Sequence, residues 1–297
     1  MSEHAAQPGL LSIVATPIGN LDDITLRALR VLREADVILA EDTRRTRGLC
    51  THHEIARPLR ALHAHSGPGA IERAVDELRA GKRLALVTDA GTPLVSDPGA
   101  ELVRAATEAG VRVEAVPGAS AVTAALTVAA IACDTFRFVG FLPRGGKRRR
   151  EVIAELQRER GASVLFESPQ RVADTLGDLA EQLGPERQIA VCRELTKLHE
   201  EVARGSAAEL AERFADGARG EITIVIAGRS GSLAADGCGA EDPAALDPEA
   251  LDARIRERLQ AGCSARDVVA ELQGSCSLPR QALYARVQAC KTALADE

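Results

Sequence analysis

The stretch Leu84-Ala-Leu-Val-Thr-Asp-Ala-Gly-Thr-Pro93 decides the fold, because an apolar run of strand length passes directly into a loop of small and polar residues. Two further segments have the same design, Ala15-Thr-Pro-Ile-Gly-Asn20 and Val116-Pro-Gly-Ala-Ser120. In open α/β sheets, ligands bind outside the carboxyl ends of strands, and glycine lets the backbone approach a ligand closely. The three loops therefore predict one ligand crevice, although any strand-to-helix loop also favours Gly and Pro.

Working outward from this stretch, short apolar runs alternate with amphipathic segments between residues 11 and about 227. This alternation predicts an α/β fold with largely parallel sheets. The expected strands are 11–15, 37–40, 59–62, 84–87 and 111–116 in a first sheet, and 136–141, 164–166, 189–193 and 222–226 in a second. The expected helices are 24–33, 71–79, 101–108, 119–130, 151–158, 172–183 and 207–214.

At 297 residues the chain exceeds the usual size of a single core, so we expect two α/β domains and a small appendage. Residues 1–118 are expected to form the first domain and 119–230 the second. The stretch 231–248 is rich in Gly, Ala, Ser, Asp and Pro and predicts an acidic flexible linker. A helical C-terminal domain, 249–297, is expected from three amphipathic segments at 252–259, 265–272 and 279–290.

Composition restricts the function. A net charge of −6 argues against a protein whose whole surface coats nucleic acid, and five Phe, one Tyr and no Trp make an aromatic stacking platform for bases unexpected. Seven scattered cysteines without CxxC spacing predict reduced thiols. No signal peptide and no apolar run of about 18 residues is evident, so we expect a cytoplasmic protein without a membrane segment.

The common nucleotide-binding motifs are missing. The segment Gly67-Pro-Gly69 is followed by Glu72 where a dinucleotide-binding loop has Gly or Ala. The segment Gly145-Gly-Lys147 lacks both the upstream Gly and the following Ser or Thr of a phosphate-binding loop. A hydride transferase and a nucleoside triphosphatase are therefore disfavoured.

The loops belong to an ordered series of motifs. In chain order these are Thr16-Pro-Ile-Gly-Asn20-Leu-Asp-Asp-Ile24, Ala40-Glu-Asp-Thr-Arg44, Asp89-Ala-Gly-Thr-Pro93 with Asp97-Pro-Gly99, Val116-Pro-Gly118, Gly140-Phe-Leu-Pro143, Phe166-Glu-Ser-Pro169 and Arg193-Glu-Leu-Thr-Lys197. Over residues 10 to 228 the series resembles the ribosomal RNA small subunit methyltransferase I family. That family methylates the 2′-hydroxyl of a cytidine in 16S rRNA and is part of the tetrapyrrole methylase superfamily. The chain departs from the family pattern at Ser66, Gly67 and Gln170.

The resemblance implies a two-domain tetrapyrrole-methylase-like fold, a class III methyltransferase, with S-adenosylmethionine bound in a cleft between two sheets. It also implies a homodimer that acts on 16S rRNA or the small ribosomal subunit. The residues expected to hold the cofactor are Pro17, Ile18, Gly19, Asn20, Asp89, Ala90, Gly91, Thr92, Pro93, Gly118, Ser120, Phe166 and Glu167.

Methyl transfer from a sulfonium needs neither a metal nor a covalent intermediate, but a ribose hydroxyl must lose its proton as it attacks. The candidate bases lie at predicted strand ends: Glu194 and Lys197, ranked slightly first, then Glu41 and Asp42, and Glu167. The alternative is that these residues form a structural ion-pair network around Arg44 and Arg193.

A basic segment follows the expected strand 136–141 and is the expected RNA contact in an otherwise acidic chain. Its cations are Arg144, Lys147, Arg148, Arg149 and Arg150, and Arg44 is a further candidate. The alternative is a solvated helix start.

Three other functions remain open. Four histidines at 52, 53, 63 and 65 suggest a metal hydrolase, although no acidic residue recurs at ligand spacing, and we expect no metal. Methylation of a tetrapyrrole carbon would leave the basic segment unexplained. A non-catalytic nucleic-acid-binding protein that uses the C-terminal helices would leave the three loops unexplained.

Overall fold

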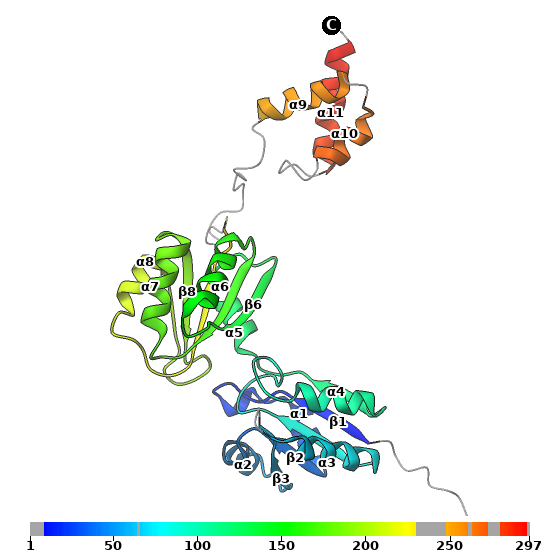
Figure 1. Ribbon diagram of the computed structural model, residues 1–297, viewed down its shortest axis with the longest axis vertical. Helices are drawn as coiled ribbons and strands as arrows, with labels where there is room; N and C mark the ends of the chain where they lie inside the picture. The colour runs from blue at the N-terminus through cyan, green and yellow to red at the C-terminus, as the bar shows by residue number, and fades with distance from the viewer. Residues whose placement is uncertain (1–8, 64–65, 230–247, 261–262, 273–279, 296–297) are drawn as a thin grey trace, which may run out of the picture. The chain divides into compact units, whose positions relative to one another are not determined.

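The computed structural model describes residues 9–63, 66–229, 248–260, 263–272 and 280–295. The chain divides into two compact units, residues 1–234 and 235–297, and the larger unit contains both sheets (Figure 1). All of the expected linker 231–248 except Pro248 lies outside the described residues. No helix of the described residues is long and apolar enough to cross a membrane.

The first sheet has the strand order β3-β2-β4-β1-β5, and every pair in it is parallel. Its strands are β1 (Leu10–Val14), β2 (Val37–Ala40), β3 (Leu59–Ala61), β4 (Arg83–Val87) and β5 (Arg112–Val116). β2 is buried along its whole length, and β1 and β4 along all but their first residue. Strands covered on both faces read as continuous apolar runs, which is why the sequence located them.

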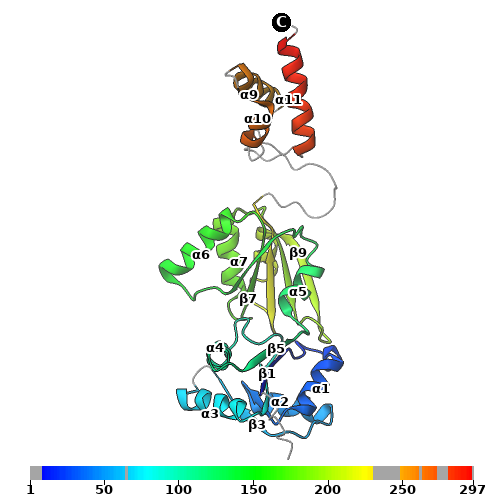
Figure 2. The same ribbon diagram turned by 90° about the vertical axis from the view of Figure 1, so that its right-hand side faces the viewer.

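Helices cover both faces of this sheet (Figure 2). The elements are the short 3-10 helix η1 (Leu21–Asp23) and the helices α1 (Leu26–Glu34), α2 (Thr43–His52), α3 (Pro68–Arg79) and α4 (Ala100–Glu108). α3 and α4 pack on one face of the sheet and α1 on the other, where Cys50 of α2 joins the core. α2 was not predicted, because its sequence Thr-Arg-Arg-Thr-Arg-Gly has no apolar stripe in its first six residues.

The second sheet corrects the expectation of largely parallel sheets. Its strands are β6 (Phe136–Phe141), β7 (Ala162–Glu167), β8 (Gln188–Arg193), β9 (Glu201–Ser206) and β10 (Ile222–Ile226), in the order β6-β7-β10-β8-β9. Only β6 and β7 are parallel, and the other three pairs are antiparallel. β9 was not predicted. It is an edge strand that pairs only with β8, and its sequence Glu-Val-Ala-Arg-Gly-Ser has little apolar character.

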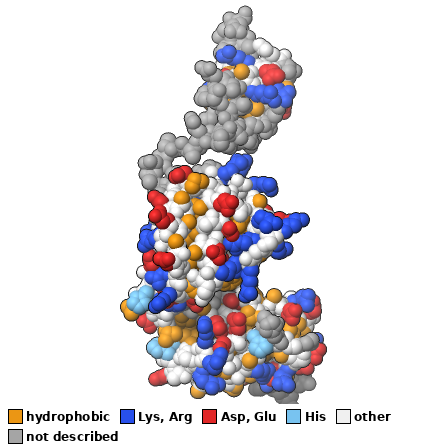
Figure 3. Space-filling view, turned by 60° about the vertical axis from the view of Figure 1, so that its left-hand side comes forward, with side chains coloured by type: hydrophobic (Ala, Val, Ile, Leu, Met, Phe, Trp, Pro, Cys, Tyr) orange, Lys and Arg blue, Asp and Glu red, His pale blue; other side chains and the backbone are white. Residues whose placement is uncertain are grey.

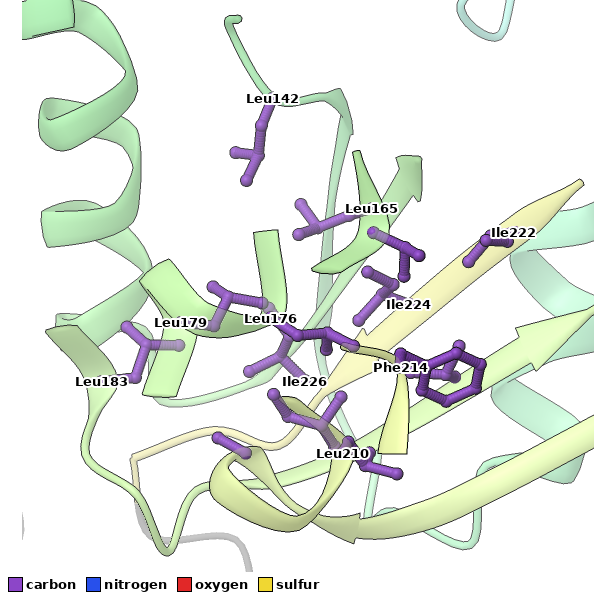
Figure 4. Packing of buried hydrophobic residues seen from close by; sticks show 14 of the residues in the cluster. Leu142, Leu165, Leu176, Leu179, Leu183, Leu210, Phe214, Ile222, Ile224 and Ile226 are labelled. Atoms are coloured by element: carbon purple, nitrogen blue, oxygen red, sulfur yellow. The ribbon is translucent and has the colours of Figure 1, made fainter. Parts of the chain in front are cut away.

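Helices α6 (Gly146–Arg158), α7 (Val172–Leu183) and α8 (Ala207–Arg213) pack on one face of the second sheet. Their leucines interdigitate with β-branched residues of the sheet, such as Ile224 and Ile226 (Figure 4). α5 (Ala121–Val128) covers the opposite face, and Ile18 from the first loop packs into that same core. This shared core places the loop after β1 against the second sheet.

The smaller unit contains α9 (Pro248–Gln260), α10 (Ala265–Leu272) and α11 (Arg280–Ala295). Its core includes Ile255, Val268 and Leu283, which are all fully buried. Ser264 accepts a hydrogen bond from the backbone N–H of Asp267 (3.3 Å) at the start of α10, as an N-terminal cap does.

Candidate functional site

The three loops are joined by backbone hydrogen bonds. The N–H of Thr16 donates to the carbonyl of Gly91 (2.9 Å), and the N–H of Gly91 donates to the carbonyl of Thr16 (3.0 Å). The Thr92 hydroxyl donates to the carbonyl of Ala119 in the third loop (3.2 Å). Gly91 has φ +78°, a conformation that other residues rarely adopt. The loops therefore form one connected surface at the carboxyl ends of β1, β4 and β5.

A pocket of about 420 Å³ opens between this surface and the second sheet. Small-molecule sites usually have volumes in this range. Eight of the residues expected to bind the cofactor line it: Ile18, Asp89, Ala90, Gly91, Thr92, Ser120, Phe166 and Glu167. Glu41, which was expected as a base, lines it as well.

The other five expected cofactor residues lie outside the pocket lining: Pro17, Gly19, Asn20, Pro93 and Gly118. A Cβ atom on Gly19 would lie 2.8 Å from the carbonyl of Leu195, so this glycine permits a close approach between the first loop and the loop after β8. The Asn20 N–H donates to the Thr196 hydroxyl (3.1 Å). These contacts hold the two α/β parts together beside the pocket.

Three carboxylates line one side of the pocket: Glu41, Asp89 and Asp97. Burial, together with the negative charges of Glu41 and Asp89, raises the pKa of Asp97 to about 6, and a hydrogen bond from Thr88 opposes the shift. Burial also raises the pKa of Glu41, as does the charge of Asp89. The Arg45 guanidinium lies 3.5 Å from the Asp89 carboxylate, at the exposed side of the group. The pocket therefore favours a cationic ligand.

Asp97 was not among the predicted site residues, although it follows the Asp89–Pro93 loop in the sequence. Leu94 and Ser96 on its N-terminal side have φ values of +74° and +67°. Such left-handed backbone is uncommon outside glycine and asparagine, and it brings the chain back toward the pocket. The sequence feature that could have identified Asp97 as a site residue is the Asp-Pro-Gly motif at residues 97–99.

Glu194 and Lys197 form an ion pair. Lys197 Nζ lies 2.7 Å from Glu194 Oε1 and 3.1 Å from Glu221 Oε2. The hydrogen bond from Lys197 lowers the pKa of Glu194, and hydrogen bonds to Glu194 and Glu221 raise the pKa of Lys197 against the effect of burial. Neither residue lines the pocket, so the geometry favours the structural alternative. Arg193 pairs instead with Glu201, at 2.8 Å.

Asp42 caps α2 and also lies outside the pocket lining. Its carboxylate accepts hydrogen bonds from the Arg44 backbone N–H (2.8 Å) and from the Arg44 guanidinium (2.7 Å). These hydrogen bonds lower the pKa of Asp42 to about 2. A carboxylate so strongly stabilised in its charged form is a poor base, so the expectation for Asp42 is corrected.

The expected phosphate contact at Arg149 is also corrected. Arg149 is buried. Its guanidinium lies 2.7 Å from Asp178 Oδ2 and donates to the Thr175 hydroxyl (3.0 Å) and the Pro143 carbonyl (3.1 Å), so it is not available to a phosphate. Thr175 in turn donates to Glu167 (2.6 Å), which lines the pocket. Arg149 thus belongs to a hydrogen-bond chain that orients Glu167.

The other cations of the basic segment are exposed, namely Arg144, Lys147, Arg148 and Arg150. Lys147 lies 3.6 Å from Glu151 one turn further along α6. Figure 3 shows Lys and Arg side chains gathered along one edge of the part that holds the second sheet. Arg44 is exposed but is held by Asp42.

Solved structures share this arrangement of two sheets. A uroporphyrin-III-C-methyltransferase from Thermus thermophilus aligns over 74% of this chain and 94% of its own, with TM-score 0.54 and 22% identity. A diphthine synthase aligns over 73% of this chain and 90% of its own, with TM-score 0.57 and 17% identity. At such identities the likeness concerns the fold, and it confirms the predicted two-domain methylase fold.

The family described as Tetrapyrrole (Corrin/Porphyrin) Methylases matches residues 10–211. Ribosomal RNA small subunit methyltransferase I of Xylella fastidiosa is 44% identical over 281 residues, which cover 93% of this chain and 98% of the relative. The protein of the same name from Thermotoga maritima is 46% identical over 222 residues, 74% of this chain and 99% of the relative. The chain therefore belongs to the tetrapyrrole methylase family and, within it, to the ribosomal RNA small subunit methyltransferase I group.

Proposed function

We propose that the chain transfers a methyl group from S-adenosylmethionine to the ribose 2′-hydroxyl of a cytidine in 16S rRNA of the small ribosomal subunit. The observation that supports this most is the likeness to ribosomal RNA small subunit methyltransferase I along almost the whole chain, in which the motifs that carry it converge on one pocket. The name of the relatives specifies small-subunit ribosomal RNA, and the cytidine and its 2′ position are our additions to it.

The pocket fits the proposed methyl donor. S-adenosylmethionine carries a positive sulfonium and a net positive charge, and the carboxylates of Glu41, Asp89 and Asp97 attract such a ligand. Apolar side chains that also line the pocket, including Val95, Phe166 and Leu195, suit the adenosine part. The donor supplies a methyl group that is already activated toward a nucleophile.

Within this pocket Asp97 is the residue we assign as proton acceptor for the attacking hydroxyl. A general base works best when its pKa lies near the working pH, and the pKa of Asp97 of about 6 keeps it ionised at neutral pH while leaving it basic. Glu41 and Asp89 maintain that pKa by their negative charge. The connected loops would hold the donor and the hydroxyl in line, and positioning of this kind lowers a barrier by about 7–11 kcal/mol at best.

The test is methyl transfer itself. The purified chain is incubated with methyl-labelled S-adenosylmethionine and small subunits from cells that lack the modification, in parallel with a tetrapyrrole precursor. Label is expected in 16S rRNA at a ribose oxygen. Label only in the macrocycle would overturn the proposal, and no transfer to either acceptor would support a protein that only binds nucleic acid.

Two glycine variants make this assay specific for the pocket. Gly91→Val places a branched side chain at the pocket wall, whereas Gly110→Val has a similar φ of +72° and no atom within 4 Å of the new Cβ. Both variants therefore place a β-branched residue at a similar positive φ. Only Gly91→Val is expected to lose transfer and donor binding.

The exposed cations of the basic segment are expected to hold RNA phosphates. Changing Arg144, Arg148 and Arg150 together to Gln should flatten the slope of log affinity against log salt by about 2, since each single-strand phosphate contact contributes about 0.7. The measurement is a salt titration of binding to single-stranded RNA. Changing the exposed Arg79, Arg104 and Arg112 is the charge-matched control, and an equal change of slope there would exclude a local phosphate site.

We also propose that the chain forms homodimers and works in the cytoplasm. Leu26 and Leu198 are 86% and 93% exposed, which makes apolar surface available for contact between subunits. The five described cysteines are free thiols, as expected of a reducing compartment. Sedimentation of the purified chain tests the dimer.

A further inference from the structure

Three of the five Phe residues lie together beside the pocket. The ring centroids of Phe138 and Phe166 are 4.9 Å apart and those of Phe141 and Phe166 are 5.7 Å apart, both in edge-to-face geometry. Phe141 and Phe166 line the pocket. Composition alone made an aromatic platform unexpected, because the number of aromatic residues does not show that three rings lie together.

A β-bulge in β6 produces this grouping. Side chains alternate between the faces of a regular strand, so Phe138 and Phe141, three residues apart, would point to opposite faces. The register shifts between Phe138 and Gly140, so that Phe138 pairs with Val164 while Phe141 pairs with Phe166 two residues later. Both rings therefore lie on the same face. Bulges commonly re-aim a side chain next to a functional site.

Gly140 allows the bulge to approach the pocket loop. Its φ is +73°, and a Cβ atom there would lie 2.9 Å from the Ser96 hydroxyl, one residue before Asp97. The chain immediately before Phe141 is thus packed against the loop that carries the proposed base. Phe141 itself remains 56% exposed although it lines the pocket, so its ring is available at the mouth.

The segment after Phe141 carries the exposed cations Arg144, Lys147, Arg148 and Arg150. Proteins that bind single-stranded RNA combine cations, which hold the backbone, with exposed aromatic rings, on which unpaired bases stack. A base whose ribose reacts must also leave its stacked position in order to reach an enclosed site. An exposed ring that lines the pocket and four exposed cations therefore lie within the ten residues 141–150.

We propose that Phe141 is the stacking platform for an unpaired base of the RNA at the mouth of the pocket, and that it thereby positions the ribose hydroxyl over the donor site. This inference rests on the proposed function and adds the residue that recognises the base. Phe166, which is less exposed, supports the Phe141 ring edge-on from within.

The test compares two probes on the intact chain, saturated with S-adenosylhomocysteine: a short labelled oligocytidine and a ribose-phosphate strand of the same length without bases. The wild type should bind the oligocytidine about tenfold more tightly, since one stacked base contributes about that factor. Phe141→Leu should bind both probes equally, and Phe141→Trp should restore the preference. Phe136→Leu, which removes a ring with 49% exposure from the same strand, is the matched control and should behave as the wild type.

Two results would overturn the inference. One is an equal loss of affinity for both probes in Phe141→Leu, and the other is a loss of S-adenosylhomocysteine affinity of the same size, which would place the ring in the donor site. The probe comparison needs no methyl transfer. A failed transfer assay with an intact base preference would therefore refute the reaction and leave the stacking role standing.

Discussion

Asp97→Asn is expected to lower kcat by about 10²- to 10⁴-fold, the usual contribution of a general base. Asn has nearly the same shape as Asp but cannot accept the proton. Affinity for S-adenosylhomocysteine, the product whose sulfur is neutral, should change little, because no carboxylate charge is needed to hold it. Single-turnover methyl transfer to small subunits measures the rate, and Asp76→Asn, an exposed carboxylate on α3, is the matched control.

The pH dependence separates a base from a structural residue. With a pKa of about 6, the wild-type rate should rise as the pH increases through 6 and then level off. The slow rate of Asp97→Asn should lack that rise. A variant that keeps the wild-type pH profile at a reduced rate would contradict the assignment of Asp97 as base.

The same variant should be more stable than the wild type at pH 8. The folded protein raises the pKa of Asp97, so folding disfavours its ionised form and stability falls as the pH rises through about 6. Asn removes the repulsion with Glu41 and Asp89. Thermal unfolding at pH 5 and pH 8 checks the sign: the variant's gain in stability over the wild type should be larger at pH 8 than at pH 5.

Arg149→Met is expected to lower the free energy of unfolding by about 3 kcal/mol, as in other cases where one partner of a buried ion pair is removed. Met preserves the apolar length of the side chain, but Thr175 loses its donor and Asp178 its counter-ion. The Asp178 side chain is 36% exposed, so water compensates part of the loss.

Urea unfolding measures this effect, with Arg148→Met, its exposed neighbour on α6, as the control. The control should unfold at the wild-type urea concentration. If Arg149→Met were equally stable and instead flattened the salt dependence of RNA binding, the role of Arg149 as a phosphate contact would be restored.

The strands that are buried on both faces were the easiest elements to predict, because a run such as Val37–Ala40 is apolar at every position. The relative directions of the strands in the second sheet could not be predicted in this way. Antiparallel partners of β10 on both sides also bury it completely, so its sequence Ile-Thr-Ile-Val-Ile resembles that of a parallel strand. β9 and α2 were missed because their sequences carry little hydrophobic periodicity.

The site was predicted where it depends on local sequence and missed where it depends on distant partners. The loop glycines and Asp89 are recognisable from strand-to-loop motifs. The burial of Arg149, in contrast, is caused by Thr175 and Asp178 on α7, and the cluster of rings is caused by a bulge that no spacing rule indicates. Asp97 lies in the Asp-Pro-Gly motif at residues 97–99, but its raised pKa depends on burial and on neighbours in space.

The acidic wall of the pocket also bears on turnover. Before transfer the proposed donor has a net positive charge, and Glu41, Asp89 and Asp97 attract it. After transfer its sulfur is a neutral thioether, so the same three side chains hold the spent donor less strongly. A pocket that binds the positively charged donor more tightly than the neutral product favours exchange of product for donor. It thereby limits product inhibition without a conformational change.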